Sequence, residues 1–511
     1  MHLQNIKLIV PAMAGIVLPH LLAAGEKVSN PNVIFILADD VGYGDLGWLG
    51  AKTILTPNVN KLADEGIRFT NCHATSSIST PSRYGLLTGL YPWRTEGTGI
   101  AAGDAAMIIQ PNQVTLPDLF KNAGYTTAAV GKWHLGLGAE TGKQNWNGYI
   151  SPNLSDIGFD YSYIMAATAD RVPCVFIENG KAVHVDPNDP IQVSYSTPFA
   201  GEPTGRKNPE LLRMHPSEGH DMAIVNGIPR IGYMKGGKQA LWRDEDIADT
   251  ITQKAIDFIS KNQQHPFFLY LATNDIHVPR VPNERFAGKS GMGPRGDAIL
   301  SFDDCVGKVM NVLDSLHLSD NTIIILSSDN GPVVDDGYQD RAVELLGEHR
   351  PGGIYRGGKY SIFEAGTRVP LIIRWKNGMQ KPDVSDALVS QLDFFRSFAA
   401  LLNQEIPADA APDSKNIWKT LTGATEKGRK YLIEQNVNNT LSVVTAQYKY
   451  IEPSNAPTYN KGTATELGNL PQEQLYDLKT DPTEKSNQAP AKKTVVNRLK
   501  KLLNSERNIS R

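Results

Sequence analysis

Five short apolar runs without interruption constrain the fold of this chain most strongly. They are rich in β-branched or aromatic residues and lie at Val33–Ala38, Thr126–Val130, Phe267–Thr273, Thr322–Ser328 and Val369–Trp375. An uninterrupted run indicates a strand that is buried on both faces of a sheet. Helix-like stretches lie between the runs, at Asn58–Glu65, Leu116–Ala123, Ile247–Lys261 and Ile299–Leu316. This alternation predicts an α/β sandwich with a large, mostly parallel central sheet.

The pattern changes from about Gly428 onward. Short runs at Lys430–Gln435, Leu441–Ala446, Tyr448–Glu452 and Gln474–Asp477 predict a small antiparallel sheet, and Ala489–Asn504 predicts a closing helix. We therefore expect a large N-terminal domain at 25–400 and a smaller α+β subdomain at 401–511. Residues 140–240 are irregular, which predicts long loops over one end of the large sheet.

The first residues resemble a targeting segment. Lys7 precedes an apolar stretch, Leu8–Leu22, and small residues follow it. A basic start, an apolar region and a small-residue cleavage site predict a secretory signal peptide at 1–24, although a buried first strand is the alternative. The stretch is short for a membrane span and contains Pro11 and Pro19. We expect a periplasmic or secreted protein with no membrane span.

Charge and cysteine content exclude some classes of function. The 511 residues include 51 Lys and Arg against 54 Asp and Glu, a formal net charge of −3. This balance argues against nucleic acid as a partner, so an anionic substrate must be bound by a few local cations. Cys72, Cys174 and Cys305 are odd in number and lack metal-site spacing. We expect them to be buried thiols rather than a disulfide.

The most specific motif is Ser79-Thr80-Pro81-Ser82-Arg83, followed by Leu87-Thr88-Gly89. Pro81 suits the first position of a helix, because its missing N–H costs nothing there. Ser79 is then expected just before a helix N-terminus, where backbone donors and the helix dipole favour negative charge. Taken alone, the same residues also fit an ordinary capped surface helix.

The motif resembles the signature of type I sulfatases, in which Cys or Ser is followed by x-Pro-Ser-Arg and then by Leu-Thr-Gly. The resemblance covers about residues 30–380 and implies the alkaline-phosphatase-like sandwich. It also implies that Ser79 is converted to formylglycine, whose hydrated aldehyde attacks sulfur. A Ser here implies maturation by an anaerobic radical-type sulfatase-maturating enzyme. Cys72 is no rival, because Ala74 stands where the motif needs Pro.

Acidic residues follow two of the predicted strands. Asp39 and Asp40 end the first run, and Asp329 and Asn330 end the fourth. An isolated pair of aspartates fits a solvated turn. However, parallel strands bring both pairs to one edge, and an all-oxygen set suits Ca²⁺, whereas zinc prefers His or Cys. The sulfatase resemblance implies that these four residues bind one calcium ion, with an oxygen of the formylglycine at Ser79 completing its shell.

Basic residues and histidines lie near the same strand ends. Lys132 and His134 follow the second run, His277 follows the third and Lys359 precedes the last. A lone Lys or His is usually a surface residue, so the roles come from the resemblance. It implies that Arg83 holds the formylglycine hydroxyl and that both lysines bind sulfate oxygens. His134 is implied as the base, and His277 as the general acid beside the leaving oxygen.

Substrate specificity rests on weaker signals. Residues 360–370 and the stretch around His349 resemble bacterial enzymes related to N-acetylgalactosamine-6-sulfatase. Asp170, Arg171 and His220 resemble residues that bind sugar hydroxyls in galactose- and N-acetylgalactosamine-6-sulfatases, although a local ion pair and an unrelated histidine are the alternative. The resemblance implies exo-acting 6-O-desulfation of galactose or N-acetylgalactosamine in host or dietary glycans, either mucin or glycosaminoglycan.

Three other functions stay open at this point. The chain could act on another sulfate position, galactose O4 or O3. It could be a phosphatase or phosphodiesterase of the alkaline phosphatase superfamily, although those typically use two metals and the sequence near Asp329 lacks a second, His-rich metal set. A non-catalytic glycan-binding protein would need a broken site, and every expected site residue is present.

Overall fold

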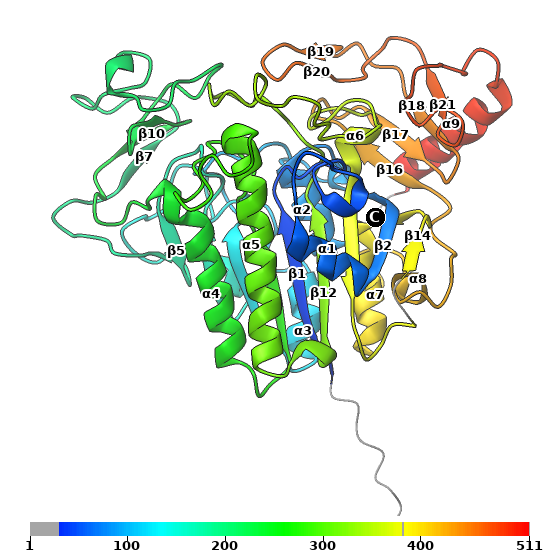
Figure 1. Ribbon diagram of the computed structural model, residues 1–511, viewed down its shortest axis with the longest axis horizontal. Helices are drawn as coiled ribbons and strands as arrows, with labels where there is room; N and C mark the ends of the chain where they lie inside the picture. The colour runs from blue at the N-terminus through cyan, green and yellow to red at the C-terminus, as the bar shows by residue number, and fades with distance from the viewer. Residues whose placement is uncertain (1–29, 381–382, 510–511) are drawn as a thin grey trace, which may run out of the picture.

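A large mixed sheet forms the centre of the molecule (Figure 1). The computed structural model describes residues 30–380 and 383–509, so the predicted signal peptide lies outside the described residues. Across the sheet the strands are β14 (Asp383–Ser385), β2 (Ile67–His73), β13 (Arg368–Arg374), β12 (Thr322–Ser328), β1 (Asn32–Ala38), β11 (Phe267–Ala272), β3 (Thr126–Lys132), β4 (Tyr161–Met165), β5 (Phe176–Glu178) and β6 (Lys181–Ala182). A short strand, β15 (Val389–Ser390), also pairs with β2. The predicted α/β sandwich is confirmed.

The five uninterrupted apolar runs are all strands of this sheet. β1 lies at its centre and pairs in parallel with β11 on one side and β12 on the other. β13 differs, because it runs antiparallel to β12. Its first residue therefore lies at the same edge as the last residues of the parallel strands. Loops that follow β1, β3, β11 and β12 and the loop that precedes β13 consequently meet at one edge.

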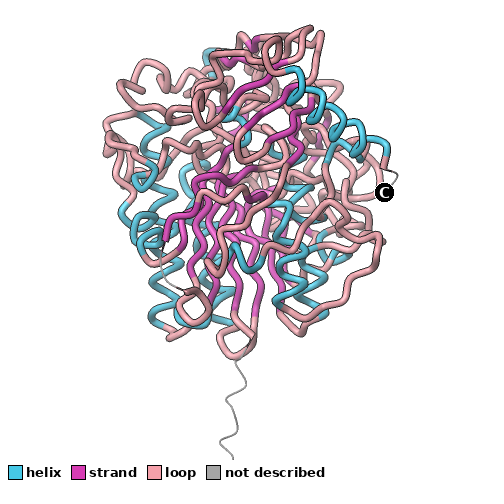
Figure 2. Tube along the Cα trace, turned by 90° about the vertical axis from the view of Figure 1, so that its right-hand side faces the viewer, coloured by secondary structure: helices cyan, strands magenta, loops and turns pink. Residues whose placement is uncertain are grey.

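Helices cover both faces of the sheet (Figure 2). One layer contains α1 (Pro57–Asp64), α4 (Ile247–Lys261) and α5 (Gly293–Ser315), which contact one another in front of the sheet in Figure 1. The other layer contains α2 (Ser79–Thr88), α3 (Leu116–Asn122) and α7 (Phe394–Leu401). Two single-turn helices, α6 (Glu364–Thr367) and α8 (Trp418–Leu421), lie in connections.

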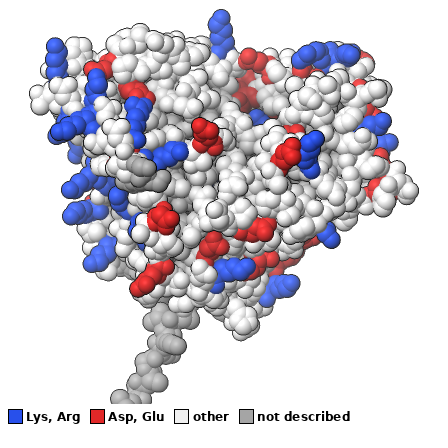
Figure 3. Space-filling view, turned by 180° about the vertical axis from the view of Figure 1, so that it is seen from behind, with Lys and Arg blue, Asp and Glu red and all other residues white. Residues whose placement is uncertain are grey.

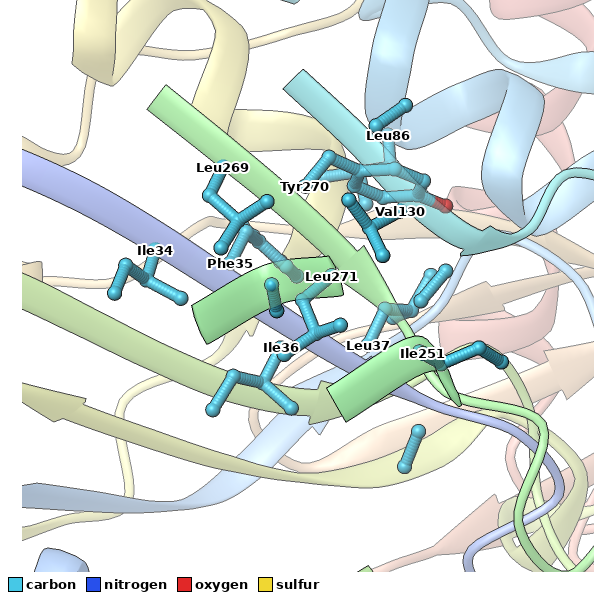
Figure 4. Close-up of a cluster of buried hydrophobic side chains, with 14 of the residues drawn as sticks. Ile34, Phe35, Ile36, Leu37, Leu86, Val130, Ile251, Leu269, Tyr270 and Leu271 are labelled. Carbon is cyan, nitrogen blue, oxygen red and sulfur yellow. The ribbon is translucent and has the colours of Figure 1, made fainter. Parts of the chain in front are cut away.

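Side chains of the central strands fill the space under both helix layers (Figure 4). Successive residues of a strand point to opposite faces, so a strand that is covered twice needs apolar residues at every position. Ile34, Phe35, Ile36 and Leu37 of β1 are all fully buried. Double coverage by helices therefore explains the uninterrupted runs.

The C-terminal part contains the predicted antiparallel sheet, formed by β16 (Leu432–Gln435), β17 (Leu441–Val444), β18 (Tyr448–Ile451) and β21 (Gln474–Asp477). The closing helix, α9 (Lys493–Asn508), begins four residues later than expected. It lies on the right in Figure 1, and Lys and Arg gather at the corresponding left margin of the back view in Figure 3.

Three two-stranded ribbons complete the described strands: β7 (Gln192–Ser194) with β10 (Tyr233–Lys235), β8 (Ile224–Val225) with β9 (Ile228–Pro229), and β19 (Tyr459–Asn460) with β20 (Thr465–Glu466). The first two lie in the region predicted as long loops. Within residues 30–380 and 383–509, no helix is both long and apolar enough to cross a bilayer. The three cysteines are buried free thiols, as expected.

Candidate active site

Acidic residues from two strand ends form a buried cluster. Asp39 and Asp40 follow β1, while Asp329 and Asn330 follow β12, and all four side chains are fully buried. The parallel register sets Ala38 beside Ser328, so the residues after each strand meet. The Asp329 N–H donates to the Ala38 carbonyl at 3.1 Å, and the Asn330 amide donates to Asp40 Oδ1 at 2.8 Å.

This cluster has the properties of a cation site. Burial, together with the charges of Asp329 and Asp40, raises the pKa of Asp39 well above its ordinary value despite the neighbouring Lys132. Asp39 Oδ2 is buried and has no hydrogen-bond partner among residues 30–380 and 383–509. One ligand atom each from Asp39, Asp40 and His277 lie within 4.8 Å of one another. A divalent cation would relieve the repulsion and satisfy the unpaired oxygen.

Ser79 lies directly against the acidic cluster. It is the first residue of α2 and is buried. Its Oγ donates to Asn330 Oδ1 at 3.3 Å and accepts from Lys132 Nζ at 2.9 Å. The helix begins at Ser79 itself, so Pro81 is its third residue rather than the first as predicted. The first four N–H groups of a helix have no partner within it, so Pro81 is equally harmless there.

Three cations face the three carboxylates. Lys132 Nζ donates to Asp39 Oδ1 at 2.6 Å, and Arg83 donates to Asp329 Oδ2 at 2.8 and 3.1 Å. Lys359 Nζ donates to Asp40 Oδ2 at 2.8 Å. Arg83 and Lys132 have fully buried side chains. Cations fixed in a dry site can stabilise negative charge more strongly than in water.

Two histidines, His134 and His277, line the same pocket as Ser79. Burial, followed by the charge of Lys132, lowers the pKa of His134 well below its ordinary value. Its Nε2 lies 3.0 Å from the Ala101 carbonyl, and Nδ1 has no hydrogen-bond partner in the described chain. Burial and Lys359 likewise lower the pKa of His277. Burial therefore favours the neutral form of both rings.

A cavity opens over these groups. Ser79, His134, His277 and Lys359 line it. The three residues predicted to bind sugar line it as well, which brings them into the same space as the sulfate-binding candidates. These three are Asp170, Arg171 and His220.

The sugar-binding candidates contact one another. His220 Nε2 lies 2.9 Å from Asp170 Oδ2, and Arg171 donates to both oxygens of Asp170 at 2.9 and 3.1 Å. Although Asp170 is buried, Arg171 and the two nearby histidines hold its pKa well below the usual range. An ionised carboxylate beside a guanidinium offers acceptors and donors to neighbouring hydroxyl groups.

The cavity also contains residues that the sequence did not single out. Asp336, Tyr360, Ile100 and Ile231 line it. Tyr360 directly follows Lys359 in the sequence, and this adjacency could have identified it as a residue of the site. Asp336 lies in the connection between β12 and β13 and belongs to no recognisable sequence motif. His73, six residues before Ser79, is fully buried, and its Nδ1 lies 2.7 Å from Glu434 Oε1 of β16.

Comparisons with known proteins agree with this geometry. The family model described as "Sulfatase" matches residues 31–404, and one described as "N-sulphoglucosamine sulphohydrolase, C-terminal" matches residues 356–509. An N-acetylgalactosamine-6-O-sulfatase of Bacteroides thetaiotaomicron is 55% identical, covering 98% of this chain and 99% of its own length. The human N-acetylgalactosamine-6-sulfatase is 31% identical over 78% of this chain and 67% of its own.

A solved structure gives the same result. A 6S-sulfatase structure, titled for the metabolism of multiple glycosaminoglycans by Bacteroides thetaiotaomicron, superimposes with a TM-score of 0.93 at 56% identity. The match covers 94% of this chain and all of that one. The Ser79 motif, the acidic cluster and these matches show that the chain belongs to the sulfatase family and is a sulfuric ester hydrolase.

Proposed function

We propose that this sulfatase removes 6-O-sulfate from terminal N-acetylgalactosamine or galactose in host or dietary glycans, either mucin or glycosaminoglycan. The single observation that carries this proposal is the shared cavity of Ser79 with Asp170, Arg171 and His220. Exo action on one terminal sugar residue is part of the same proposal. The 55% identical relative named N-acetylgalactosamine-6-O-sulfatase supports the same substrate class.

Ser79 is proposed to be the precursor of formylglycine, made by an anaerobic radical-type maturating enzyme. Once hydrated, formylglycine supplies the oxygen that attacks sulfur and a second hydroxyl that permits release of sulfate. A buried position at the start of α2 suits that oxygen, because backbone donors and the helix dipole favour negative charge. Arg83, held by Asp329, is the proposed positioning group for it.

Asp39, Asp40, Asp329 and Asn330, with the modified Ser79, are proposed to bind one calcium ion. All four side chains offer oxygen, which a hard cation prefers. The unpaired Asp39 Oδ2 and the raised pKa of Asp39 fit a missing positive charge. When bound, the ion would supply a Lewis acid at the nucleophile.

The remaining groups bind sulfate and move protons. Lys132 and Lys359 are proposed to bind sulfate oxygens and to stabilise the charge that develops on them. His134, neutral and with a free Nδ1 in the described chain, is the proposed base. His277 is the proposed donor of a proton to the leaving oxygen, and this role requires it to take up a proton first, because burial favours its neutral form.

Export through a signal peptide at 1–24 and a division into a catalytic domain at 25–400 and a C-terminal subdomain at 401–511 complete the proposal. An exported enzyme would meet glycan polymers directly.

The specificity is tested by sulfate release from monosaccharide sulfates by matured enzyme. We expect turnover of N-acetylgalactosamine-6-sulfate or galactose-6-sulfate and little turnover of the 4- and 3-sulfates. Turnover of galactose-4-sulfate without the 6-sulfate would contradict the proposal.

Two further measurements test the chemistry. Comparison of sulfate and phosphate esters of one sugar should favour sulfate, whereas faster phosphate release would indicate a phosphatase. Intact mass of protein co-expressed with its maturating enzyme should show the loss of two hydrogen atoms, absent in Ser79→Ala.

A further inference from the structure

We propose that the segment 334–338 sets the distance between the sulfate site and the sugar site. This inference rests on the proposed function. The segment lies in the connection between β12 and β13. Asp336 holds Lys359 on one side, and the adjacent Gly337 seats His220 on the other. Both are positioning residues, because each acts through a group that touches substrate.

Two carboxylates hold Lys359 in place. Its Nζ lies 2.8 Å from Asp336 Oδ2 and 2.8 Å from Asp40 Oδ2. Asp40 belongs to the proposed cation site, whereas Asp336 lies outside it and is the second carboxylate that contacts this lysine. An ammonium group has three N–H donors. These carboxylates accept two of the N–H groups. The third N–H group is then left for a ligand in the cavity that Lys359 lines.

Asp336 is itself held against the nucleophile segment. Its Oδ1 accepts from the Tyr360 hydroxyl at 2.8 Å. The Tyr360 N–H donates to the carbonyl of Ser77, two residues before Ser79, at 2.9 Å. Tyr360 has φ of +78°, a conformation that an aromatic residue keeps only where its surroundings impose it. The position of Asp336 is therefore tied to that of Ser79.

His220 packs against the next residue of the segment, Gly337. Gly337 has φ of +105°, and a Cβ added there would lie 2.1 Å from His220 Nδ1. The imidazole therefore packs directly on the backbone of Gly337, while its Nε2 contacts Asp170. The Ser217 N–H donates to the Gly337 carbonyl at 2.9 Å, which fixes the loop that carries His220.

Asp336 and Gly337 are consecutive, so their Cα atoms are about 3.8 Å apart. The sulfate-binding lysine and the sugar-binding histidine are thus placed by one rigid piece of backbone. An ester at O6 stands one CH₂ group farther from the ring than an ester at O4. Fixed spacing between the two sites can distinguish these substrates, because only one of them reaches both sites at once.

The two reaction products separate the two sites in an experiment. Inorganic sulfate reports on the sulfate site, and N-acetylgalactosamine reports on the sugar site, each through its inhibition constant. For Asp336→Asn we expect about a tenfold higher constant for sulfate and a lower kcat, because a charge-assisted hydrogen bond is lost. The constant for the sugar should stay within about twofold. Asp335→Asn makes the same charge change one residue away and should leave the sulfate constant unchanged.

Gly337→Ala tests the other side. We expect about a tenfold higher inhibition constant for the sugar and an unchanged constant for sulfate, because the added methyl displaces His220. Gly347→Ala is the matched control: it also has positive φ, but a Cβ there meets no atom within 4 Å. If the Gly337 variant does not fold, Ser217→Ala, which removes a 2.7 Å contact with Asp335, should raise the sugar constant in the same selective way.

The spacing proposal is overturned if the variants change both inhibition constants in parallel, or if they change neither constant. They would show that the segment has only a structural role, which thermal unfolding would register as a loss of stability in both variants. The proposed function fails in a different way, namely if the matured wild-type enzyme releases no sulfate from either 6-sulfated sugar.

Discussion

Glu484 should make the protein less stable as pH rises, and Glu484→Gln should abolish that effect. The side chain is fully buried, its Oε2 accepts from the Glu364 N–H at 2.7 Å, and its Oε1 has no partner among the described residues. Burial and the nearby Glu364 and Glu434 raise its pKa from 4.5 to about 8, although Lys449 opposes this. Folded protein therefore keeps a proton that unfolded protein releases.

The sign follows from proton linkage. Between about pH 4.5 and 8 the folded state binds more protons than the unfolded state, so the free energy of unfolding falls as pH rises. The difference between 4.5 and about 8 sets an upper limit of about 5 kcal/mol, since one pKa unit is worth about 1.4 kcal/mol. Relaxation around a buried charge reduces such penalties, so we expect about 1–3 kcal/mol.

Thermal unfolding of both proteins between pH 5 and 9 measures this. A neutral Gln resembles protonated Glu, so the two melting temperatures should agree near pH 5. At pH 9 the variant should melt about 1–3 °C higher, because the melting shift per kcal/mol shrinks as the chain lengthens. Other groups titrate in both proteins and cancel in the difference. Glu202→Gln, at an exposed position, is the control. A difference in melting temperature between the two proteins that stays constant or shrinks as pH rises would refute the reasoning.

Three other changes should have direct effects. Lys449→Met leaves two buried glutamates without their shared cation and should destabilise by about 3–5 kcal/mol, measured by urea unfolding. Asp45→Asn weakens the paired contacts of 2.7 and 2.8 Å with Arg295, and should lower the melting temperature while leaving the inhibition constant for sulfate unchanged. Calcium at 100 times its dissociation constant should stabilise unmodified protein by about 2.7 kcal/mol, a shift that chelation reverses and Asp39→Ala removes.

Most of the central sheet could be predicted, because a strand that is buried on both faces has a recognisable local pattern, an uninterrupted apolar run. β1, β11 and β12 are apolar along their length, apart from polar residues at some strand ends. The sequence alone therefore identifies them as buried strands. β2 was missed, because its partly exposed residues, Arg68 and Thr70, alternate with buried ones and interrupt the apolar pattern. Strand direction was also hidden: nothing local distinguishes antiparallel β13 from its parallel neighbours.

Some residues of the candidate site could likewise be predicted from the sequence, and others could not. Ser79, Lys132 and Asp329 stand in short motifs at strand or helix ends, so the resemblance identified them. Asp336 and its contact with Lys359 depend on how two long connections pack together. Such packing is set by contacts between residues far apart in the chain, and no local spacing encodes it.

The C-terminal sheet is part of the environment of the nucleophile. The last residue of β16, Gln435, also pairs with a segment outside its sheet: the Gln435 N–H donates to the Thr75 carbonyl, and the Ser77 N–H donates to the Gln435 carbonyl, both at 3.1 Å. A parallel bridge thus holds the segment that leads into Ser79. The Val437 N–H also donates to the Tyr360 carbonyl, beside Lys359. Because two chemically important segments obtain backbone partners from β16 and the residues after it, the C-terminal part cannot be a passive appendage. Removing it would leave backbone groups of Thr75, Ser77 and Tyr360 unpaired, which costs free energy wherever water cannot replace the lost partner.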